Sequence, residues 1–379
     1  MKKFFGILLS LFIFTNCALA QNEVNFIYIN GSNTNTQKSK DWFYNGVAKF
    51  HPKLKTQLEY SDFFQTKMLN SGKYKISSNP AYLFWGDMSK NELEVLKEDI
   101  GILSGISPRV AQFVREFIAD CFHDAIWISK FQNMMPVLDL LHAQIQENHK
   151  RGDKVVLMGY SAGTFVNYQY FLTRMPVIDI DTMVENLEIS TKTEIKETFE
   201  YKDTCLDALF RAEILTYNMI GRLVANSNKM DLDKNLSKID EYTKNYCAPD
   251  GVILGLVNYA SPIPLFYSEF LSESYKISDI KTLLGKYLIE NNMFYLTVNF
   301  ADDPLGIPSS KNVTFKQINE TIKKDIQPNG GFFYEKSDVA SPMPFFGAHT
   351  SYWKCAKKFA KAITMAYEQG YKFFYSNEN

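Results

Sequence analysis

The chain has 379 residues, of which 46% are hydrophobic, 22% charged and 15% aromatic. Its 41 lysines and arginines nearly balance 42 aspartates and glutamates, which leaves a formal net charge of −1. A nucleic-acid-binding protein usually carries a basic excess or stripe, so this balance argues against that class. The apolar content is too high for a disordered chain, and the length is sufficient for one large core.

The N-terminus has the pattern of a secretory signal peptide. Two lysines precede the apolar stretch Phe4–Phe14, and Ala18-Leu19-Ala20 follows as a small-x-small cleavage site. The stretch is too short for a permanent transmembrane helix, and no later apolar run is longer. We therefore predict that residues 1–20 are removed and that the mature protein is exported to a periplasm or to the extracellular medium.

Export would place the mature cysteines in an oxidising compartment. Cys121, Cys205, Cys247 and Cys355 allow three disulfide pairings. Cys205 and Cys247 fall in one charged segment, so a bridge between them is one interpretation, whereas Cys121 and Cys355 are equally compatible with buried free thiols. No His/Cys cluster has the spacing of metal ligands, and we expect no metal.

Apolar strands alternate with amphipathic helices along the mature chain. Runs typical of buried strands are Val24–Asn30, Ala81–Trp85, Lys154–Met158, Val252–Tyr259, Met293–Phe300 and residues 331–335. Helical spacing covers residues 107–119, 131–150, 163–174, 312–326 and 351–369. This alternation predicts an α/β fold with a mostly parallel central sheet flanked by helices.

Residues 177–250 interrupt the alternation. They are charged, favour helix and carry few strand signals, and their apolar residues recur at helical spacing. We interpret them as a helical cap inserted into a single domain that covers residues 21–379. A lid over an acyl pocket and a plain packed lobe are both compatible with this pattern.

The motif that indicates chemistry is Gly159-Tyr160-Ser161-Ala162-Gly163. A hydrophobic strand precedes it and a helix follows it, which is the context that a G-x-S-x-G nucleophile requires. Glycines flank the serine because larger side chains would clash with the neighbouring strand and helix. We predict that Ser161 is a nucleophile and that the N–H of Ala162 binds a developing oxyanion. An ordinary glycine turn with a solvated serine is the alternative.

A serine nucleophile of this kind is followed in the chain first by an acid and then by a histidine. Of five histidines only His349 follows Ser161, in a loop before the terminal helix, with Ser351 as a suitable N-cap. We predict that His349 is the general base, with a surface loop histidine as the alternative. The earlier histidines His123, His142 and His149 are interpreted as packed or solvated side chains.

The acid is expected after a strand between these two residues, because it must orient the imidazole and stabilise the imidazolium. Asp302 and Asp303 both follow the strand that ends at Phe300, and neighbouring side chains point apart, so only one can serve. We predict Asp303, because Pro304 fixes the chain direction after it, and keep Asp302 as the alternative acid. Asp338 is a more distant candidate.

A second oxyanion donor is expected from the loop after the first strand, where Gly31 permits close approach of the backbone and Ser32 or Asn33 supplies the N–H.

With the segments FIYINGSN, VVLMGYSAG, FADDPLGIP and GAHTSYW, in this order, the chain resembles the α/β-hydrolase superfamily, on the side of serine lipases and esterases. The resemblance implies Ser161 as nucleophile, His349 as base, Asp303 as acid, and backbone donors at Ala162 and near Ser32. The chain departs from the family pattern where Asn30-Gly31 replaces His-Gly, and in lacking the early antiparallel strands.

These residues predict a serine hydrolase that cleaves carboxylic esters, including lipid or acyl esters, through an acyl-enzyme intermediate and without a cofactor. Another reaction of the same residues, such as acyl transfer or thioester or peptide cleavage, is an alternative. A non-catalytic secreted binding protein on a hydrolase scaffold is a second. We expect a small-molecule or lipid ester as partner, no nucleic acid, and at most peripheral membrane contact; the oligomeric state is left open.

Overall fold

The computed structural model describes residues 21–32, 36–99, 119, 123–124, 126–129, 131–174, 248–263, 288, 292–308 and 331–375. The predicted signal peptide, nearly all of the predicted cap, most of the helix at 107–119 and the whole helix at 312–326 lie outside these ranges. Cys121, Cys205 and Cys247 also lie outside them, whereas Cys355 is a free thiol.

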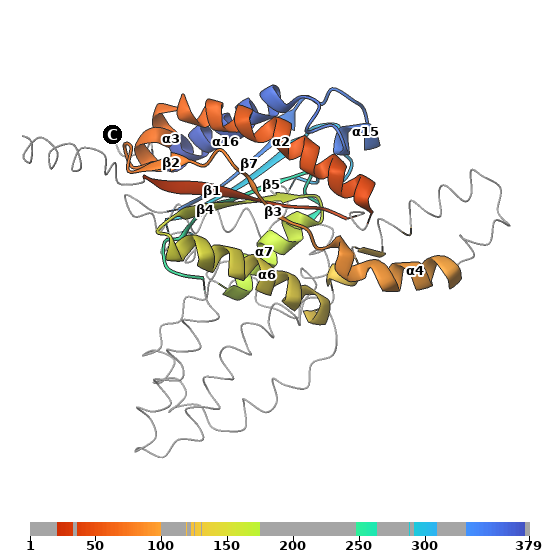
Figure 1. The fold of residues 1–379 in the computed structure, drawn as a ribbon. Helices are drawn as coiled ribbons and strands as arrows, with labels where there is room; N and C mark the ends of the chain where they lie inside the picture. The colour runs from red at the N-terminus through yellow and green to blue at the C-terminus, as the bar shows by residue number, and fades with distance from the viewer. Residues whose placement is uncertain are drawn as a thin grey trace, which may run out of the picture.

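A seven-stranded sheet forms the centre of the protein (Figure 1). Its strands are β1 (Asn22–Ile29), β2 (Tyr74–Ile76), β3 (Ala81–Leu83), β4 (Lys154–Tyr160), β5 (Ile253–Tyr259), β6 (Phe294–Phe300) and β7 (Phe332–Val339). The order is β2-β1-β4-β5-β6-β7, and β3 also pairs with β1. Every pairing among these strands is parallel. The predicted α/β class with a mostly parallel sheet is confirmed.

The central strands are buried on both faces. Six of the seven residues of β4 and all seven of β6 are buried. Strands covered on both sides are nearly continuous apolar runs, because each alternate side chain meets a layer of helices. This explains why the sequence shows compact apolar segments here rather than strict alternation of polar and apolar residues.

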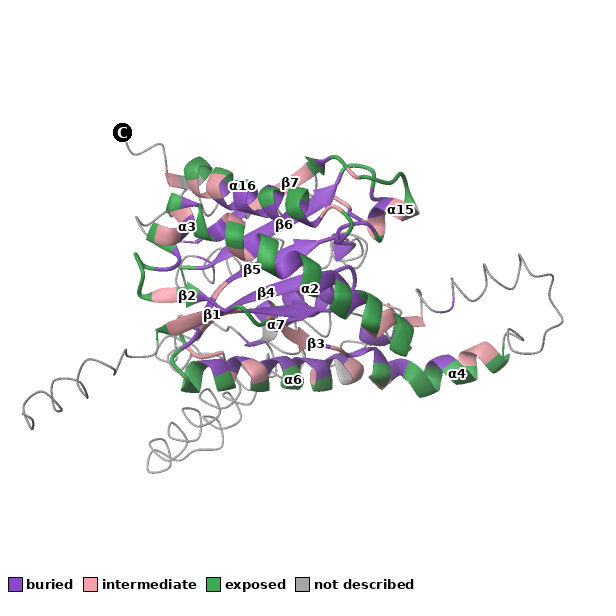
Figure 2. Cartoon of the chain, turned by 45° about the horizontal axis from the view of Figure 1, so that its top comes forward, coloured by how far each residue is buried: buried purple, intermediate pink, exposed green. Residues whose placement is uncertain are grey.

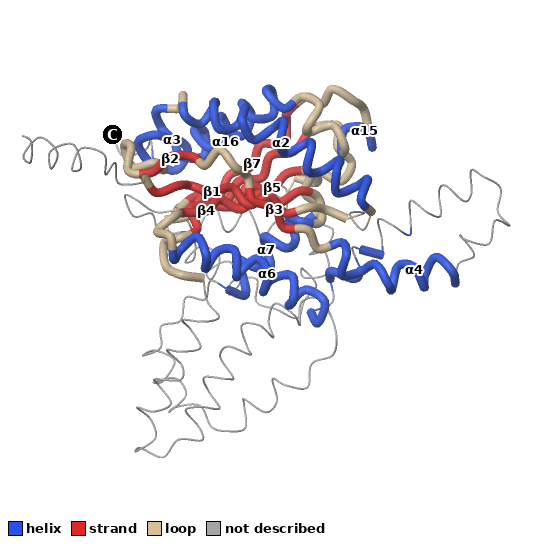
Figure 3. Tube along the Cα trace, in the orientation of Figure 1, coloured by secondary structure: helices blue, strands red, loops and turns tan. Residues whose placement is uncertain are grey.

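Helices cover both faces of the sheet (Figures 1 and 3). On one face lie α2 (Gln37–Glu59), α3 (Asp62–Lys67) and α16 (Ala356–Tyr375), and on the other lie α6 (Phe131–Lys150) and α7 (Gly163–Arg174). Their inner surfaces are buried and their outer surfaces exposed (Figure 2). The remaining described elements are a 3-10 helix (Gly86–Ser89), α4 (Lys90–Asp99) and the short α15 (Phe346–His349). In the portion of the chain described, none of the helices combines the length and apolarity needed to cross a bilayer.

Two strand boundaries differ from the prediction. The strand at Ala81 ends at Leu83, because Trp85 already leads into the 3-10 helix and its backbone N–H is bonded to Asn30 rather than to a strand. The last strand continues past the predicted end at residue 335 to Val339, because its pairing with β6 extends that far.

The helices were predicted less completely. The terminal helix begins at Ala356 and not at Ser351, which is no N-cap because its hydroxyl donates to the carbonyl of Ala348. Helix α2 was not predicted, and it contains both Gly46 and Pro52, residues that normally weaken a helical pattern. Tertiary packing overrides this local preference.

Gly46 allows α2 to approach the segment that precedes α16. A Cβ atom at Gly46 would lie 2.4 Å from Cδ1 of Trp353, whose ring also packs against Phe50 at a centroid distance of 5.4 Å. Trp353 is four residues from His349 in the chain. The close approach at Gly46 therefore fixes the segment that follows His349 against α2.

We predict that Gly46→Ala lowers the free energy of unfolding by about 1–3 kcal/mol, because the added methyl overpacks against the Trp353 ring. Helix propensity alone would give the opposite sign, since alanine usually stabilises a helix interior by about 1 kcal/mol relative to glycine. Chemical denaturation measures the difference. Asn45→Ala, at the exposed neighbouring position, is the matched control, and a Gly46→Ala variant as stable as the wild type contradicts the prediction.

Candidate active site

Ser161 lies in the sharp turn between β4 and α7. Its φ of 50° is in the left-handed region, which residues other than glycine rarely adopt. The N–H of Ser161 donates to the carbonyl of Tyr259 at 3.1 Å, and its own carbonyl accepts from the N–H of Thr164 at 2.9 Å. These bonds tie the strained turn to β5 on one side and to the first turn of α7 on the other.

Three glycines allow this turn to form without steric clashes. A Cβ at Gly159 would meet the backbone of Gly163 at 2.8 Å, and one at Gly163 would lie 2.5 Å from carbonyl oxygens at the end of β1. A Cβ at Gly31 would lie 2.7 Å from Cβ of Ser161. The steric reason expected for the glycines of the motif is confirmed, and Gly31 in the loop after β1 meets the same constraint.

The three side chains predicted to act together form one hydrogen-bonded line. Nε2 of His349 lies 3.0 Å from Oγ of Ser161, and Nδ1 of His349 lies 3.0 Å and 3.1 Å from the two carboxylate oxygens of Asp303. The side chain of His349 is 13% exposed and that of Asp303 is fully buried. Such a line lets the imidazole accept a proton from the hydroxyl while the carboxylate stabilises the resulting positive charge.

Asp303, and not Asp302, faces the histidine. Asp302 is exposed in the turn after β6, whereas Asp303 turns inward and accepts hydrogen bonds from the N–H of Leu305 and from the hydroxyl of Tyr352, both at 2.9 Å. Burial by itself would raise the pKa of Asp303. The hydrogen bond and the charge of His349, with these two further donors, outweigh burial and hold the pKa below its ordinary value. The carboxylate is therefore ionised at neutral pH.

His349 is the last residue of the short helix α15, and so the expectation of an irregular loop was wrong. Phe345 directly precedes this helix, with a φ of 50° in the left-handed region. The hydroxyl of Tyr160 donates to the carbonyl of His349 at 2.8 Å, and the Tyr160 ring packs on the imidazole with centroids 5.5 Å apart. Tyr160 therefore holds the histidine by both its backbone and its ring.

The loop after β1 is held by Trp85. Asn30 is fully buried; its side-chain oxygen accepts from the N–H of Trp85 at 3.1 Å, and its carbonyl accepts from the indole N–H at 2.8 Å. The side-chain amide of Asn30 donates to the carbonyl of Gly31 at 2.7 Å. Asn30 thus shapes the backbone that leads to Ser32, while Asn33 lies outside the described residues.

The remaining candidate residues make other contacts or are exposed to solvent. His142 contacts the hydroxyl of Tyr170 at 2.8 Å, and His149 is exposed on α6, as their interpretation as packed or solvated residues requires. His123 is partly buried beside Asp124. Asp338 is exposed and pairs with Lys336 at 2.8 Å.

Three residues of the cluster were missed from the sequence, namely Asn30, Tyr160 as a support of His349, and Tyr352. The only local signal for Tyr352 is its position three residues after His349. The bonds of Asn30 and Tyr160 span 55 and 189 residues, and no local pattern reports such distances.

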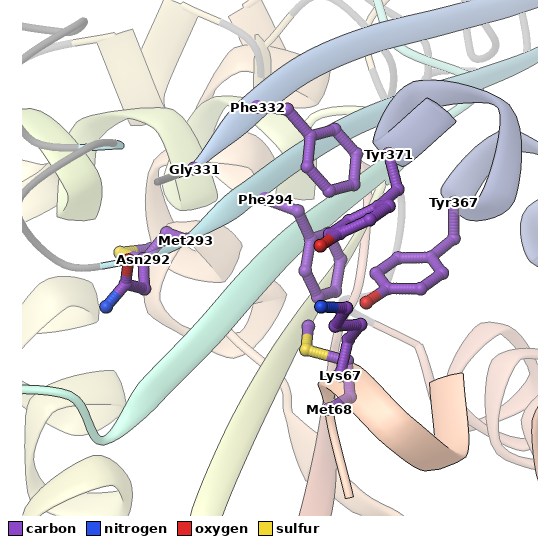
Figure 4. Close-up of a pocket in the computed structure, with 9 residues that line it drawn as sticks. All are labelled: Lys67, Met68, Asn292, Met293, Phe294, Gly331, Phe332, Tyr367 and Tyr371. Carbon is purple, nitrogen blue, oxygen red and sulfur yellow. The ribbon is translucent and has the colours of Figure 1, made fainter. Parts of the chain in front are cut away.

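A cavity of about 320 Å³ lies at the other end of the sheet, beside the starts of β6 and β7 (Figure 4). Phe294, Phe332, Tyr367 and Tyr371 form its aromatic walls, with Lys67 at one side. None of the residues that line it belongs to the Ser161 cluster. Within the described ranges, no group of His, Cys, Asp and Glu side chains could hold a metal ion.

We predict that Gly31→Ala slows covalent labelling of Ser161 by a fluorophosphonate probe at least about tenfold, because the new methyl occupies space beside the hydroxyl that a nucleophile must keep free. The labelling rate measures the effect. Far-ultraviolet circular dichroism and the melting temperature control for a general loss of structure. Unchanged labelling in a folded variant contradicts the proximity of this loop to the serine.

Comparison with models of known protein families, with curated proteins and with solved structures gives no match to this chain. The chemistry of the site therefore has to be argued from its own geometry.

Proposed function

We propose that the protein is a serine hydrolase of the α/β-hydrolase type that cleaves carboxylic esters through an acyl-enzyme intermediate. The observation that carries the proposal is the line from Oγ of Ser161 through the imidazole of His349 to Asp303, with contacts of 3.0 Å at each step. It begins on a left-handed turn at the carboxyl end of a parallel sheet, where α/β proteins usually bind their ligands. A serine that only completes a turn needs neither the base nor the buried acid.

Acylation follows from these contacts. Nε2 of His349 takes the proton of Ser161 as Oγ attacks the ester carbonyl, and the buried carboxylate of Asp303 stabilises the imidazolium. The carbonyl oxygen becomes an oxyanion that accepts hydrogen bonds from the N–H groups of Ala162 and Ser32. The imidazolium then protonates the departing alkoxide, the C–O bond breaks, and the acyl group remains on Ser161.

Deacylation reverses these roles. A water molecule gives its proton to His349 and attacks the acyl carbon, and the second tetrahedral intermediate collapses to release the carboxylic acid and regenerate the Ser161 hydroxyl. Ala162 supplies its N–H at the start of α7, where the helix dipole also favours negative charge.

Apolar side chains beside the site support substrates with an apolar group. The Trp42 ring is 38% exposed and packs against Tyr160, with centroids 5.8 Å apart, and Tyr160 in turn covers His349. Met343 and Phe345, in the segment before His349, are 42% and 74% exposed. Neutral esters with an apolar acyl or alcohol part therefore fit this rim better than charged ones. The prediction of export accords with a substrate outside the cytoplasm.

Acyl transfer, thioester cleavage and peptide cleavage would use the same three groups. These reactions are the alternative to ester hydrolysis. They differ from ester hydrolysis in the acceptor or the leaving group, so product analysis separates them. A non-catalytic binding protein would not require an ionised carboxylate that is hydrogen-bonded to the histidine.

We predict that Ser161→Ala reduces hydrolysis of short and long aryl esters by at least about a thousandfold, because the nucleophile is lost while binding is retained. Initial rates across an acyl-chain series measure this effect. Ser78→Ala, an exposed serine outside the site, is the matched control. Equal rates for wild type and Ser161→Ala, together with no probe labelling of the wild type, would falsify the proposed function.

We predict that Asp303→Asn lowers kcat by about a thousandfold or more at pH 7, because the amide favours the imidazole tautomer whose Nε2 carries the proton and cannot accept one. Asp302→Asn is the control, since this adjacent carboxylate is exposed. Steady-state kinetics of the two variants measure the contrast. A greater loss for Asp302→Asn assigns the acid to the alternative residue.

A further inference from the structure

We propose that Tyr352 is a positioning residue: its phenol holds the carboxylate of Asp303 and shares its charge, and so sets the pH range in which Ser161 is reactive. The inference rests on the proposed function for its kinetic readout, but its geometry and its spectroscopic readout stand apart from any substrate.

Tyr352 is fully buried and makes two hydrogen bonds with its hydroxyl. The hydroxyl donates to Oδ2 of Asp303 at 2.9 Å and accepts from the backbone N–H of Phe300 at 3.0 Å. The ring lies flat against that of Phe300, with centroids 4.0 Å apart and planes 11° apart. The last residue of β6 therefore fixes the tyrosine, and the tyrosine fixes the acid three residues beyond that strand.

The direction of these bonds is set by electrostatics. Burial, and next the negative charge of Asp303, raise the pKa of Tyr352 well above its ordinary value. The phenol is therefore protonated at neutral pH. Because the N–H of Phe300 donates to the phenol oxygen, the phenol proton is left to point at the carboxylate.

This donor competes with the histidine for one negative charge. Oδ1 of Asp303 accepts from the N–H of Leu305, Oδ2 accepts from Tyr352, and Nδ1 of His349 lies between both oxygens. A carboxylate that shares its charge with more donors stabilises the imidazolium less. Losing the phenol therefore makes the imidazolium more stable and leaves the base protonated up to a higher pH.

Among the described residues, no ionisable side chain other than His349 and Tyr352 is hydrogen-bonded or ion-paired to Asp303. His349 faces Ser161 and the ring of Tyr160, and Tyr352 is in ring contact with Tyr160 and Tyr259. Asp302 is exposed to solvent on the same turn. The phenol of Tyr352 is thus the one neutral side chain that donates to Asp303 among the described residues, beside the backbone N–H of Leu305.

Tyr259 provides a matched comparison. It is fully buried, its ring centroid lies 5.7 Å from that of Tyr352, and its hydroxyl has no hydrogen-bond partner among the described residues. Tyr259→Phe and Tyr352→Phe remove the same atom from the same aromatic cluster. Only the second removes a bond to the acid.

The test measures the rate of fluorophosphonate labelling of Ser161 from pH 5 to pH 9 in the wild type and in both variants. For Tyr352→Phe we expect an acidic limb whose midpoint is about half a pH unit higher, and a rate on that limb about twofold to threefold lower. For Tyr259→Phe we expect the wild-type midpoint. A midpoint that stays in place or moves down in Tyr352→Phe overturns the inference, because a tyrosine that only fills the core would change the amount of folded protein and not the limb.

A second variant tests the inference if the Tyr352→Phe protein folds poorly. Replacement of Tyr352 by 3-fluorotyrosine keeps the ring and the hydroxyl but makes the phenol a stronger donor. The limb should then move to lower pH, opposite to Tyr352→Phe, and a shift in the same direction as Tyr352→Phe counts against the proposal.

The pH midpoint of the His349 imidazole resonances, assigned by their loss in His349→Gln, gives the same comparison without any reaction. If the wild type does not react with the probe but its imidazole midpoint still responds to Tyr352→Phe, the proposed function is refuted, and of the inference the positioning of Asp303 by Tyr352 is kept. If the wild type reacts normally with the probe, but Tyr352→Phe changes neither the midpoint of the labelling rate nor that of the imidazole resonances, the inference is refuted and the proposed function is kept.

Discussion

The structure depends on one steric constraint, the close crossing of α7 over the end of β1. Carbonyl oxygens at the end of β1 would lie 2.5 Å from any Cβ at position 163, so only glycine fits there. Ser161, two residues earlier, enters the helix in a left-handed conformation. The register of the sheet pairs Ile29 with Gly159, so the loop after β1 continues alongside Ser161. The serine and the loop expected to bind the oxyanion are thus brought together by the same strand pairing.

The other groups reach this point because all the pairings are parallel. In a parallel sheet the carboxyl ends of neighbouring strands lie along one edge, so the residues that follow β4 and β6, and the helix that follows β7, meet there. Each member of the cluster has a buried support: Tyr160 for His349, Tyr352 for Asp303, and Asn30 with Trp85 for the loop after β1. Such a network is stable only when its polar atoms are paired, because an unpaired polar atom is costly in a buried site.

The sequence was sufficient to predict those features whose causes are local. The turn at Ser161 follows from two glycines between a strand and a helix, and Asp303 follows from an apolar strand and a proline. Both are short-range patterns. His349 could be predicted only because it is the single histidine after the serine. Its helical setting was not predicted, because a helix of four residues leaves no periodic pattern in the sequence.

Features with distant causes could not be predicted. Nothing in the sequence near Asn30 indicates that Trp85 will bind it. Nothing within α2 compensates for the low helix propensity of Gly46 and Pro52, and the packing of this helix against Trp353 appears only in the structure. Nothing in the sequence beside Tyr352 indicates its role, because the polar bond that distinguishes it from a core aromatic is a contact across 49 residues.

The wide separation of the interacting residues has a kinetic consequence. The contact between His349 and Ser161 joins positions 188 residues apart, and each parallel pairing closes a long loop before it gains a hydrogen bond. Helices can form early from nearby residues, but the serine acquires its hydrogen-bond partner His349 only after β6, β7 and α15 have docked. A nascent or partly folded chain would therefore carry an ordinary serine hydroxyl, and the reactivity proposed for Ser161 would appear only with completed folding.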